Sequence, residues 1–375
     1  MKILHVGKFY SPIEGGIESI NKVVVNALKG NSQRIISFNN FNKSKYEDID
    51  GIPVLREALW GVVRRQPLSY KYYGDLKRLV KYYAPDVIHF HYPNPLVAFY
   101  LLLLNLDKTK VIVHWHSDIV AQKNFLPFIY PIERCLLKRA DVIIATSENY
   151  RDNSISLKHF VDKVKVIPCS IDENSFGLSS DDVKKIEKIK ESYQNRSIVF
   201  FVGRHVDYKG IKYLLDAEKM IKAECVIVVG GVGPLTESLR KQYTSERIKW
   251  IGRVSNEEMK LYYHAAAILA FPSITKNEAF GVVLAEAMSC GTPAITFTIK
   301  GSGVNWVAPN NIAAIEVENS NSEAYAEAID KLLTDENLRH ELGVNAKKRT
   351  IELFSKNVVE EQYCKLYASL VNERP

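Results

Sequence analysis

One stretch near the start of the chain carries the pattern of a β-strand, a loop and an α-helix. It is Lys2-Ile-Leu-His-Val-Gly-Lys-Phe-Tyr-Ser-Pro-Ile-Glu-Gly-Gly-Ile-Glu-Ser-Ile-Asn-Lys-Val-Val-Val-Asn-Ala-Leu-Lys29. The apolar run at 2–7 predicts a buried strand, and the apolar spacing over 17–29 predicts an amphipathic helix. Strands joined to helices in this way build parallel sheets. The stretch therefore predicts an α/β fold.

The loop of this unit ends in a glycine pair, Gly15-Gly16, at the predicted start of the helix. Unpaired backbone N–H groups at a helix start attract phosphate, and glycine lets an anion approach the backbone closely. Both glycines are therefore candidates for ligand binding. A tight strand-to-helix turn without any ligand explains the pair equally well.

The same alternation of short apolar runs and amphipathic stretches continues along the chain. Further strands are expected at 33–38, 86–91, 110–116, 141–146, 163–168, 197–202, 224–230, 247–251, 267–272, 292–297 and 313–317. The pattern lapses in a polar stretch before residue 197. We therefore predict two Rossmann-like domains, 1–170 and 197–355, joined by a linker at 171–196. The sequence leaves open whether 356–375, a helical segment, packs back on the first domain.

Composition indicates a folded protein, with 46% apolar and 25% charged residues. Lys and Arg outnumber Asp and Glu by 50 to 43, which favours an anionic partner, and no nucleic-acid motif is present. The five cysteines have no metal-site or redox spacing, which fits a reducing cytosol. The first residues lack the zones of a signal peptide, and the longest apolar run, 96–106, is too short to span a bilayer. A cytoplasmic location is expected.

The second predicted domain repeats the strand, loop and helix pattern with two cations in the loop, Gly203-Arg204-His-Val-Asp-Tyr-Lys209-Gly210. Arg204 offers a planar fork for phosphate oxygens and Lys209 a mobile point charge. Together they can neutralise a departing diphosphate. A pair of solvated surface cations is the alternative reading.

Two glutamates bracket a predicted helix start in Thr275-Lys-Asn-Glu278-Ala-Phe-Gly281-Val-Val-Leu-Ala-Glu286-Ala-Met-Ser-Cys-Gly291-Thr-Pro293. Residues 280–282 would present free amides at the helix start, with Glu286 about two turns into the helix. Such a segment suits a sugar nucleotide, because Glu278 can accept hydrogen bonds from sugar hydroxyls and Glu286 from a ribose. Two acids that merely complement the helix dipole are the alternative.

Two histidine pairs, His89-Phe-His91 and His114-Trp-His116, end two predicted strands. Alternation along a strand puts each pair on one face of the sheet. A four-histidine metal site is conceivable, but neither pair brings a carboxylate or thiolate ligand. We therefore expect no metal. Ligands of open α/β sheets bind at the carboxyl ends of strands, where His116-Ser117-Asp118 should emerge.

Taken in chain order, these segments resemble the retaining glycosyltransferase family 4, whose members have the GT-B fold with two Rossmann-like domains facing each other across a cleft. The resemblance spans nearly the whole chain. It rests on Gly15-Gly16-Ile-Glu18, on His116, on Gly203-Arg204 with Lys209-Gly210, and on an E-x7-E motif formed by Glu278 and Glu286.

The resemblance implies a retaining transfer of a hexose-type sugar from a nucleotide diphosphate sugar, with neither a cofactor nor a metal. Four residues would be catalytic: Glu278, His116, Arg204 and Lys209. The implied donor-binding residues are Gly16, Arg204, Lys209, Arg253, Val254, Glu278, Ala279, Phe280, Gly281, Val282 and Glu286, with the base near Arg253 and Val254. The implied acceptor-binding residues are Gly15, His116, Ser117 and Asp118. The loop Lys300-Gly-Ser-Gly-Val-Asn-Trp306 departs from the Gly-Gly and glutamate pattern of many members.

Aromatic residues and cations alternate over 60–83, and an apolar aromatic patch follows at 125–130. Such surfaces can rest on an anionic bilayer, although an amphipathic helix packed on a sheet gives the same pattern. We therefore expect a glycan or lipid-linked acceptor of O-antigen or capsule synthesis at the cytoplasmic membrane face. The alternatives are a soluble transferase making a small glycoside or glucan, a GT-B nucleotide-sugar epimerase, and a dinucleotide oxidoreductase suggested by Gly230-Gly-Val-Gly233. A non-catalytic binding module is a further alternative, against which the set of Arg204, Lys209, Glu278 and Glu286 argues.

Overall fold

The computed structural model describes residues 1–13, 15–63, 66–119 and 126–372. The chain divides into two compact units. The first contains Met1–Ser170 together with Val359–Pro375, and the second contains Ile171–Val358. No helix in the described part of the chain is long and apolar enough to cross a membrane.

The first unit is built on an eight-stranded sheet in the order β10-β9-β8-β7-β1-β2-β4-β3. All neighbouring strands are parallel except β3 and β4, which form an antiparallel pair at one edge. The strands are β1 (Lys2–Val6), β2 (Ser32–Phe38), β3 (Lys45–Ile49), β4 (Ile52–Glu57), β7 (Val87–Tyr92), β8 (Lys110–Trp115), β9 (Val142–Ala145) and β10 (Val164–Val166). A separate hairpin contains β5 (Gly61–Val63) and β6 (Gln66–Leu68).

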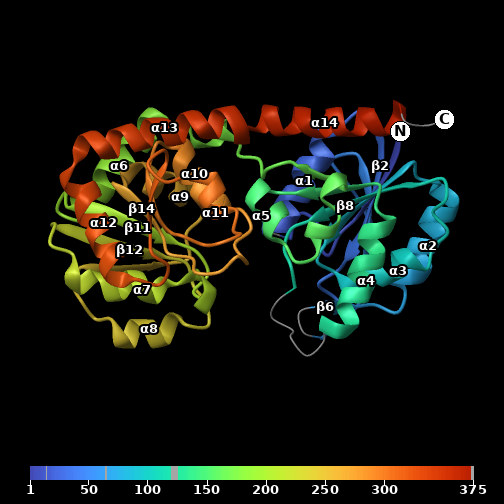
Figure 1. Cartoon of the computed structure of the whole chain (residues 1–375), viewed down its shortest axis with the longest axis horizontal. Helices are drawn as coiled ribbons and strands as arrows, with labels where there is room; N and C mark the ends of the chain where they lie inside the picture. The colour runs from blue at the N-terminus through green and yellow to red at the C-terminus, as the bar shows by residue number, and fades with distance from the viewer. Residues whose placement is uncertain (14, 64–65, 120–125, 373–375) are drawn as a thin grey trace. The chain divides into compact units, whose positions relative to one another are not determined.

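Helices cover the faces of this sheet (Figure 1). They are α1 (Gly16–Ala27), α2 (Tyr72–Tyr83), α3 (Pro95–Leu102), α4 (Leu126–Arg139), α5 (Glu148–Asn153) and the C-terminal part of α14 (Lys356–Asn372). Every residue of β7 is buried, as expected for a strand covered on both faces. One core cluster combines Ile3 of β1 and Val24 of α1 with Val359, Tyr363 and Tyr367 of α14. The final helix therefore packs on the first unit, which the sequence had left open.

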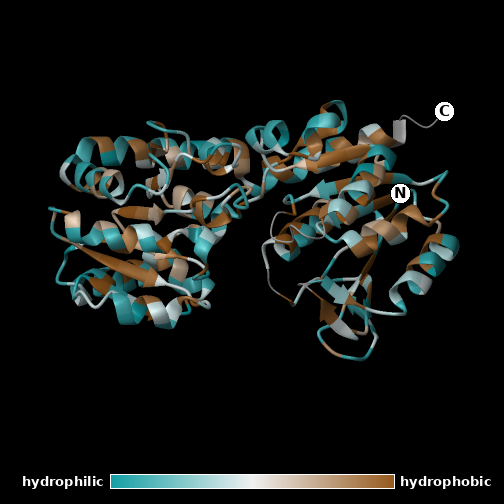
Figure 2. Cartoon of the chain, turned by 60° about the horizontal axis from the view of Figure 1, so that its bottom comes forward, coloured by the Kyte–Doolittle hydropathy of each residue, from teal (hydrophilic) through white to brown (hydrophobic). Residues whose placement is uncertain are grey.

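The second unit contains a six-stranded, wholly parallel sheet in the order β13-β12-β11-β14-β15-β16. The strands are β11 (Ser197–Val202), β12 (Cys225–Gly230), β13 (Ile248–Gly252), β14 (Ile268–Phe271), β15 (Ala294–Phe297) and β16 (Ala314–Val317). The helices are α6 (Ser180–Ser192), α7 (Ile211–Ala217), α8 (Thr236–Gln242), α9 (Asn256–Ala265), α10 (Val282–Ser289), α11 (Val304–Val307), α12 (Ser322–Thr334) and α13 (Glu336–Phe354). Figure 2 shows hydrophobic strands in the interior of each unit and hydrophilic outer helix surfaces.

The stretch 171–196, expected to be a linker, is instead part of the second unit. Helix α6 begins at a capping box formed by Ser179 and Asp182, and Asp182 forms an ion pair with Lys260 of α9 at 2.8 Å. Only Ile186 of this helix is buried. The polar composition that suggested a linker is therefore that of a surface helix held by its cap and one ion pair.

Each unit thus has the parallel, helix-covered sheet of a Rossmann-like domain, and the predicted fold class is confirmed. The predicted strands of the second unit agree with the observed ones to within about two residues at each end, the usual uncertainty of element boundaries. In the first unit, β3 to β6 were not expected.

Candidate active site

The loops after β11 and β14 carry most of the predicted donor-binding residues, and the loop after the neighbouring strand β12 lies beside them. Strand β11 lies between β12 and β14 in the sheet. Because the strands are parallel, the loops after them lie at one edge, where ligands of open α/β sheets bind. These loops are 203–210, 231–235 and 272–281. Residues far apart in the sequence are thereby brought to one place.

Lys209 and Glu278 form an ion pair across two of these loops. Both side chains are only 14% exposed, so water screens the pair far less than at an open surface. The Lys209 ammonium also lies 5.1 Å from the centre of the Phe271 ring, and Ser273 donates a hydrogen bond of 3.4 Å to the Glu278 carboxylate. Two of the predicted catalytic residues are therefore in direct contact, with a cation and a carboxylate at one point.

Glycines allow the three loops to pack closely. Gly210 has a left-handed conformation, with φ of 61°, and a Cβ at this position would collide with the carbonyl oxygen of Pro272. A Cβ at Gly231 or Gly233 would collide with backbone atoms of the loop after β11. Gly231 and Gly233, two of the glycines that suggested a dinucleotide fingerprint, are thus explained by contact between two loops of the protein itself.

Helix α10 begins directly after Gly281, whose φ is 84°. No side chain of the described residues caps this helix start, and the first N–H groups of an α-helix have no intrahelical acceptors. The backbone of 280–282 therefore offers donors for an anion at the same edge of the sheet as Lys209. Phe280 is buried and packs edge-to-face on Phe354, which anchors the segment.

Glu286 lies one turn into α10, not two, because the helix begins only at Val282. Its carboxylate accepts a hydrogen bond of 2.8 Å from the hydroxyl of Tyr263. Burial raises the pKa of Glu286, while the Tyr263 hydrogen bond opposes that shift. Tyr263 is fully buried in α9 and was not anticipated as a partner, since nothing in the sequence connects it with Glu286.

The other predicted donor residues lie near this edge with fewer contacts. Arg204, in the loop after β11, and Arg253, in the loop after β13, are exposed. Val254 is half-buried and packs against Gly230, where a Cβ would be too close to its side chain. Ala279 is half-buried between Glu278 and Phe280.

Ser302 was missed by the sequence reasoning, which set the loop 300–306 aside. Its hydroxyl donates a hydrogen bond of 2.5 Å to the backbone carbonyl of Glu278. The loop 300–306 therefore holds the glutamate segment in place, although its sequence differs from the one that many members of the resembled family have there.

In the first unit, Gly15 and Gly16 lie at the start of α1, as the sequence predicted. Gly15 has an extended backbone that any residue adopts, with φ of 173°. A Cβ on Gly16 would meet no atom within 4 Å among the described residues, so its backbone is open to an approaching group. Neither position therefore requires glycine for its own conformation, although a Cβ at Gly15 would collide with the Glu18 carboxylate. Ligand binding by the pair stays a prediction.

Ser117 and Asp118 follow β8, at the carboxyl edge of the first sheet. Asp118 is engaged by the protein itself, since its carboxylate accepts hydrogen bonds from Trp115 at 3.0 Å and Ser154 at 2.6 Å. Its backbone N–H donates to the Tyr150 hydroxyl at 2.5 Å. Asp118 thus fixes the shape of the loop that carries Ser117, which is half-buried.

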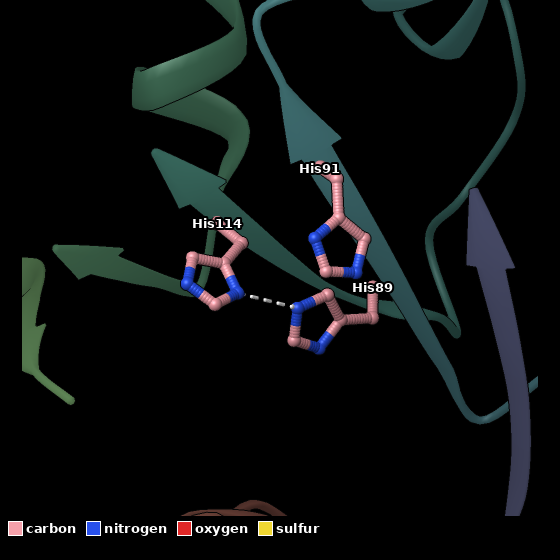
Figure 3. A group of neighbouring side chains, drawn as sticks. All are labelled: His89, His91 and His114. Atoms are coloured by element: carbon pink, nitrogen blue, oxygen red, sulfur yellow. Dashed lines mark hydrogen bonds between the residues drawn. The ribbon is translucent and has the colours of Figure 1, made fainter. Parts of the chain in front are cut away.

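The two histidines of β7, His114 of β8 and His116 directly after β8 form a buried group with two internal hydrogen bonds. His116 Nε2 lies 2.9 Å from His91 Nδ1, and His114 Nδ1 lies 3.2 Å from His89 Nε2. Figure 3 shows the second pair, with His91 beside it. The rings of His114 and His116 are stacked at 4.2 Å, and those of His91 and His116 at 5.2 Å. We call these four residues the histidine stack.

Burial keeps the stack uncharged. It lowers the pKa of His116 to about 3 and that of the other three well below their usual value, and the neighbouring histidines lower those three further. The stack is anchored from α14, where the Tyr367 hydroxyl lies 2.6 Å from His89 Nδ1. This contact joins positions 278 residues apart and could not be read from the sequence.

His89, His91 and His114 bring three nitrogens within 4.8 Å of one another, which is the spacing of a possible metal site. Within the described residues, the group contains no carboxylate or thiolate. A divalent ion would therefore bring two uncompensated charges into a fully buried place. The residues present do not suit such an ion, and the expectation of a metal-free enzyme is retained as a proposal.

The fold is similar to that of a solved structure with two Rossmann-like domains. The Anabaena protein HepE, solved in complex with UDP, aligns with a TM-score of 0.80 and 18% identity, covering 98% of this chain and 100% of that one. This likeness and the two Rossmann-like units show that the chain has the GT-B fold, which is found in glycosyltransferases.

The family follows from the sequence matches. Residues 15–175 match the family Glycosyltransferase Family 4, and residues 182–349 match Glycosyl transferases group 1. The chain belongs to the glycosyltransferases, with a Glycosyltransferase Family 4 region followed by a Glycosyl transferases group 1 region. The O-antigen chain mannosyltransferase C of Escherichia coli is 29% identical over the whole of both chains. The D-rhamnosyltransferase WbpZ of Pseudomonas aeruginosa is 27% identical, covering 95% of this chain and 92% of that protein.

Proposed function

We propose that the chain transfers a hexose-type sugar from a nucleotide diphosphate sugar to a growing surface glycan, with retention of the anomeric configuration and without a metal ion. The observation that carries the proposal is the contact of Lys209 with Glu278 beside the uncapped start of α10. The names of the two relatives, an O-antigen mannosyltransferase and a rhamnosyltransferase, support the reaction type and the kind of product.

The diphosphate of the donor would be bound at this edge by charge and by backbone donors. Lys209, Arg204 and the amides of 280–282 supply positive potential where negative charge grows as the sugar leaves. Glu278, already oriented by Ser273, would accept hydrogen bonds from hydroxyls of the transferred sugar. Glu286 would accept a hydrogen bond from the ribose. HepE, of the same fold, was solved with UDP, which supports a nucleotide diphosphate as ligand.

The chemical step would take place on one face of the sugar. The bond between the anomeric carbon and the phosphate oxygen breaks, and the acceptor hydroxyl attacks the same face of the oxocarbenium-like centre. The hydroxyl proton passes to the leaving phosphate oxygen, so the step needs no protein base. The protein contributes positioning and the cationic groups that stabilise the departing diphosphate.

A membrane contact is proposed for the hairpin of the first unit. Its exposed apolar surface comprises Trp60, Val62, Val63 and Tyr70, and Trp60 is 70% exposed. The exposed Lys71 follows in the sequence, whereas Arg64 and Arg65, named in the sequence pattern, lie outside the described residues. Aromatic and aliphatic side chains beside cations suit the interface of an anionic bilayer. We call Trp60, Val62, Val63 and Tyr70 the hairpin surface.

Sedimentation with vesicles tests the membrane contact. Vesicles of anionic phosphatidylglycerol should bind the wild-type chain, and the double variant Trp60→Ser, Val62→Ser should bind less. Val344→Ser, which removes an exposed apolar residue from the second unit, is the matched control. Equal binding of all three proteins would exclude a role for the hairpin surface.

The transferase activity is tested with a panel of UDP-, GDP- and ADP-sugars. A true donor raises the apparent melting temperature, because a ligand that binds only the folded state stabilises it, and its nucleotide diphosphate is released on addition of acceptor. The anomeric configuration of the product decides between retention and inversion. Donor binding without any transfer to glycan acceptors would leave a binding protein and refute the proposed function.

A further inference from the structure

The hydrogen bonds of the histidine stack restrict where each ring carries its proton. A neutral imidazole has one N–H and one bare nitrogen, so a hydrogen bond between two neutral rings contains a single proton. In the pair of His91 and His116 that proton belongs either to His91 Nδ1 or to His116 Nε2. Each choice determines whether the other nitrogen of each ring carries a proton or a lone pair.

Both opposite nitrogens, His91 Nε2 and His116 Nδ1, are buried and have no hydrogen-bond partner among the described residues. If His116 donates to His91, the unpaired N–H is at His91 Nε2. If His91 donates to His116, the unpaired N–H is at His116 Nδ1. An unpaired buried N–H costs about 1–3 kcal/mol, so the two arrangements differ in where this cost falls and in whether a ligand can remove it.

The two positions differ in their place in the sheet. His91 is 1% exposed and lies inside β7, between the stacked rings of His89 and His114. His116 is 7% exposed and follows the last residue of β8, where Ser117 continues into the loop at the carboxyl edge. His116 therefore lies at the edge of the sheet where ligands of open α/β folds bind, whereas His91 is enclosed by the rings of the stack.

The second pair of the stack follows the same rule. His114 Nε2 is buried and unpartnered among the described residues, and His89 Nδ1 has the Tyr367 hydroxyl as its neighbour. With the proton on His114 Nδ1, His89 donates from Nδ1 to the tyrosine oxygen and no N–H remains unpaired in this pair. The opposite arrangement would leave an unpaired N–H at His114 Nε2, in the core.

We propose that His91 donates its Nδ1 proton to His116 Nε2 and thereby holds His116 as the Nδ1–H tautomer, which presents an N–H to a substrate oxygen at the carboxyl edge of the first sheet. His91 is then a positioning residue. The inference rests on the proposed function, since the oxygen would be a hydroxyl of the sugar or of the acceptor. His116 binds through this nitrogen and cannot take up a proton there, which agrees with a step that needs no protein base.

The tautomer is measured directly in the unaltered protein. Long-range proton–nitrogen NMR correlations on histidine-labelled protein distinguish the Nδ1–H, Nε2–H and charged forms, and loss of one signal set in His116→Asn assigns it. We expect the Nδ1–H form of His116 at pH 7. The Nε2–H form or a charged ring would overturn the inference, whatever the activity of the enzyme.

Two substitutions at His91 test the positioning role. His91→Asn keeps an amide N–H near the place of Nδ1, whereas His91→Leu removes the donor. We expect kcat within about threefold of wild type for the first and a loss of about tenfold for the second, the effect of one hydrogen bond. His116 should lose its single tautomer only in His91→Leu. Equal kcat and an unchanged His116 tautomer in both variants would contradict the inference.

A control and the wild-type spectrum keep the test decisive. His5→Asn alters another buried histidine, which bonds to Gln33 at 2.8 Å and whose ring lies beside that of His89, so it should leave the His116 tautomer unchanged. If His91→Leu does not fold, the wild-type tautomer still decides. If no sugar nucleotide is turned over, the proposed function fails while the tautomer result stands.

Discussion

Replacing Lys209 by Met isolates the role that we assign to the charge in the loop after β11. Methionine keeps most of the side-chain length and its contact with the Phe271 ring, but it removes the cation that pairs with Glu278. Since both partners are only 14% exposed, the charge acts in a place from which water is largely excluded. Loss of such a stabilising group costs about 2–4 kcal/mol in the transition state.

This energy corresponds to a decrease in kcat of about 30- to 1000-fold. Initial rates of nucleotide diphosphate release give kcat, and calorimetry gives donor affinity separately. Lys212→Met, which removes an exposed lysine from α7 a few residues further along the chain, is the control and should keep normal kinetics. Near-normal kcat for Lys209→Met in folded protein would refute the reasoning.

A double substitution separates two explanations of that loss. If Lys209 acts only by orienting Glu278, then Lys209→Met has no further effect once Glu278→Gln is present. If Lys209 stabilises the leaving diphosphate itself, the second substitution lowers kcat again. We expect the second result.

Three further predictions follow from the structure. Activity should persist in excess chelator, because the cationic side chains replace a metal ion; loss in EDTA with recovery in Mn²⁺ or Zn²⁺ would contradict this. Gly210→Ala should destabilise the protein by at least about 1–3 kcal/mol and abolish activity, because its positive φ and the Pro272 carbonyl exclude a Cβ, whereas Gly74→Ala in α2 meets no atom within 4 Å and should be tolerated. The free energy of unfolding should fall by about 2 kcal/mol between pH 7 and pH 5 for each of His5 and His116, whose pKa values burial lowers to about 4 and about 3. The unfolded chain takes up these protons near pH 6.5 and the folded one only at lower pH, so stability is lost on acidification; urea titrations showing equal stability at both pH values would refute the buried neutral stack.

The parallel strands could be predicted well because their sequences are short, apolar and separated by helical patterns. Strand β11 has the bounds that the sequence indicates, 197–202. The pair β3 and β4 was missed because β3, at the edge of the sheet, is largely charged and lacks an apolar run. A signal was nevertheless present, since Asp50-Gly51 joins the two strands with φ of 53° and 80°, as in a two-residue hairpin.

The chemistry of the site was predictable in its residue types but not in its contacts. Glu278 and Lys209 were selected by their loops, yet their pairing depends on β11 and β14 being neighbours in the sheet. The partners that orient the site, Tyr263 and Ser302, are ordinary residues in sequence and become visible only when helices and loops pack. Glu286 was expected one turn too deep, because the helix start depends on the positive φ of Gly281.

We propose that the chain moves a sugar from a nucleotide diphosphate sugar to a glycan with retention of the anomeric configuration. The most direct measurement is the proton NMR spectrum of the product formed by purified enzyme, donor and acceptor in the presence of EDTA. We expect a new glycosidic linkage with the anomeric configuration of the donor. A product of inverted configuration, or donor that is only hydrolysed or epimerised, would contradict it.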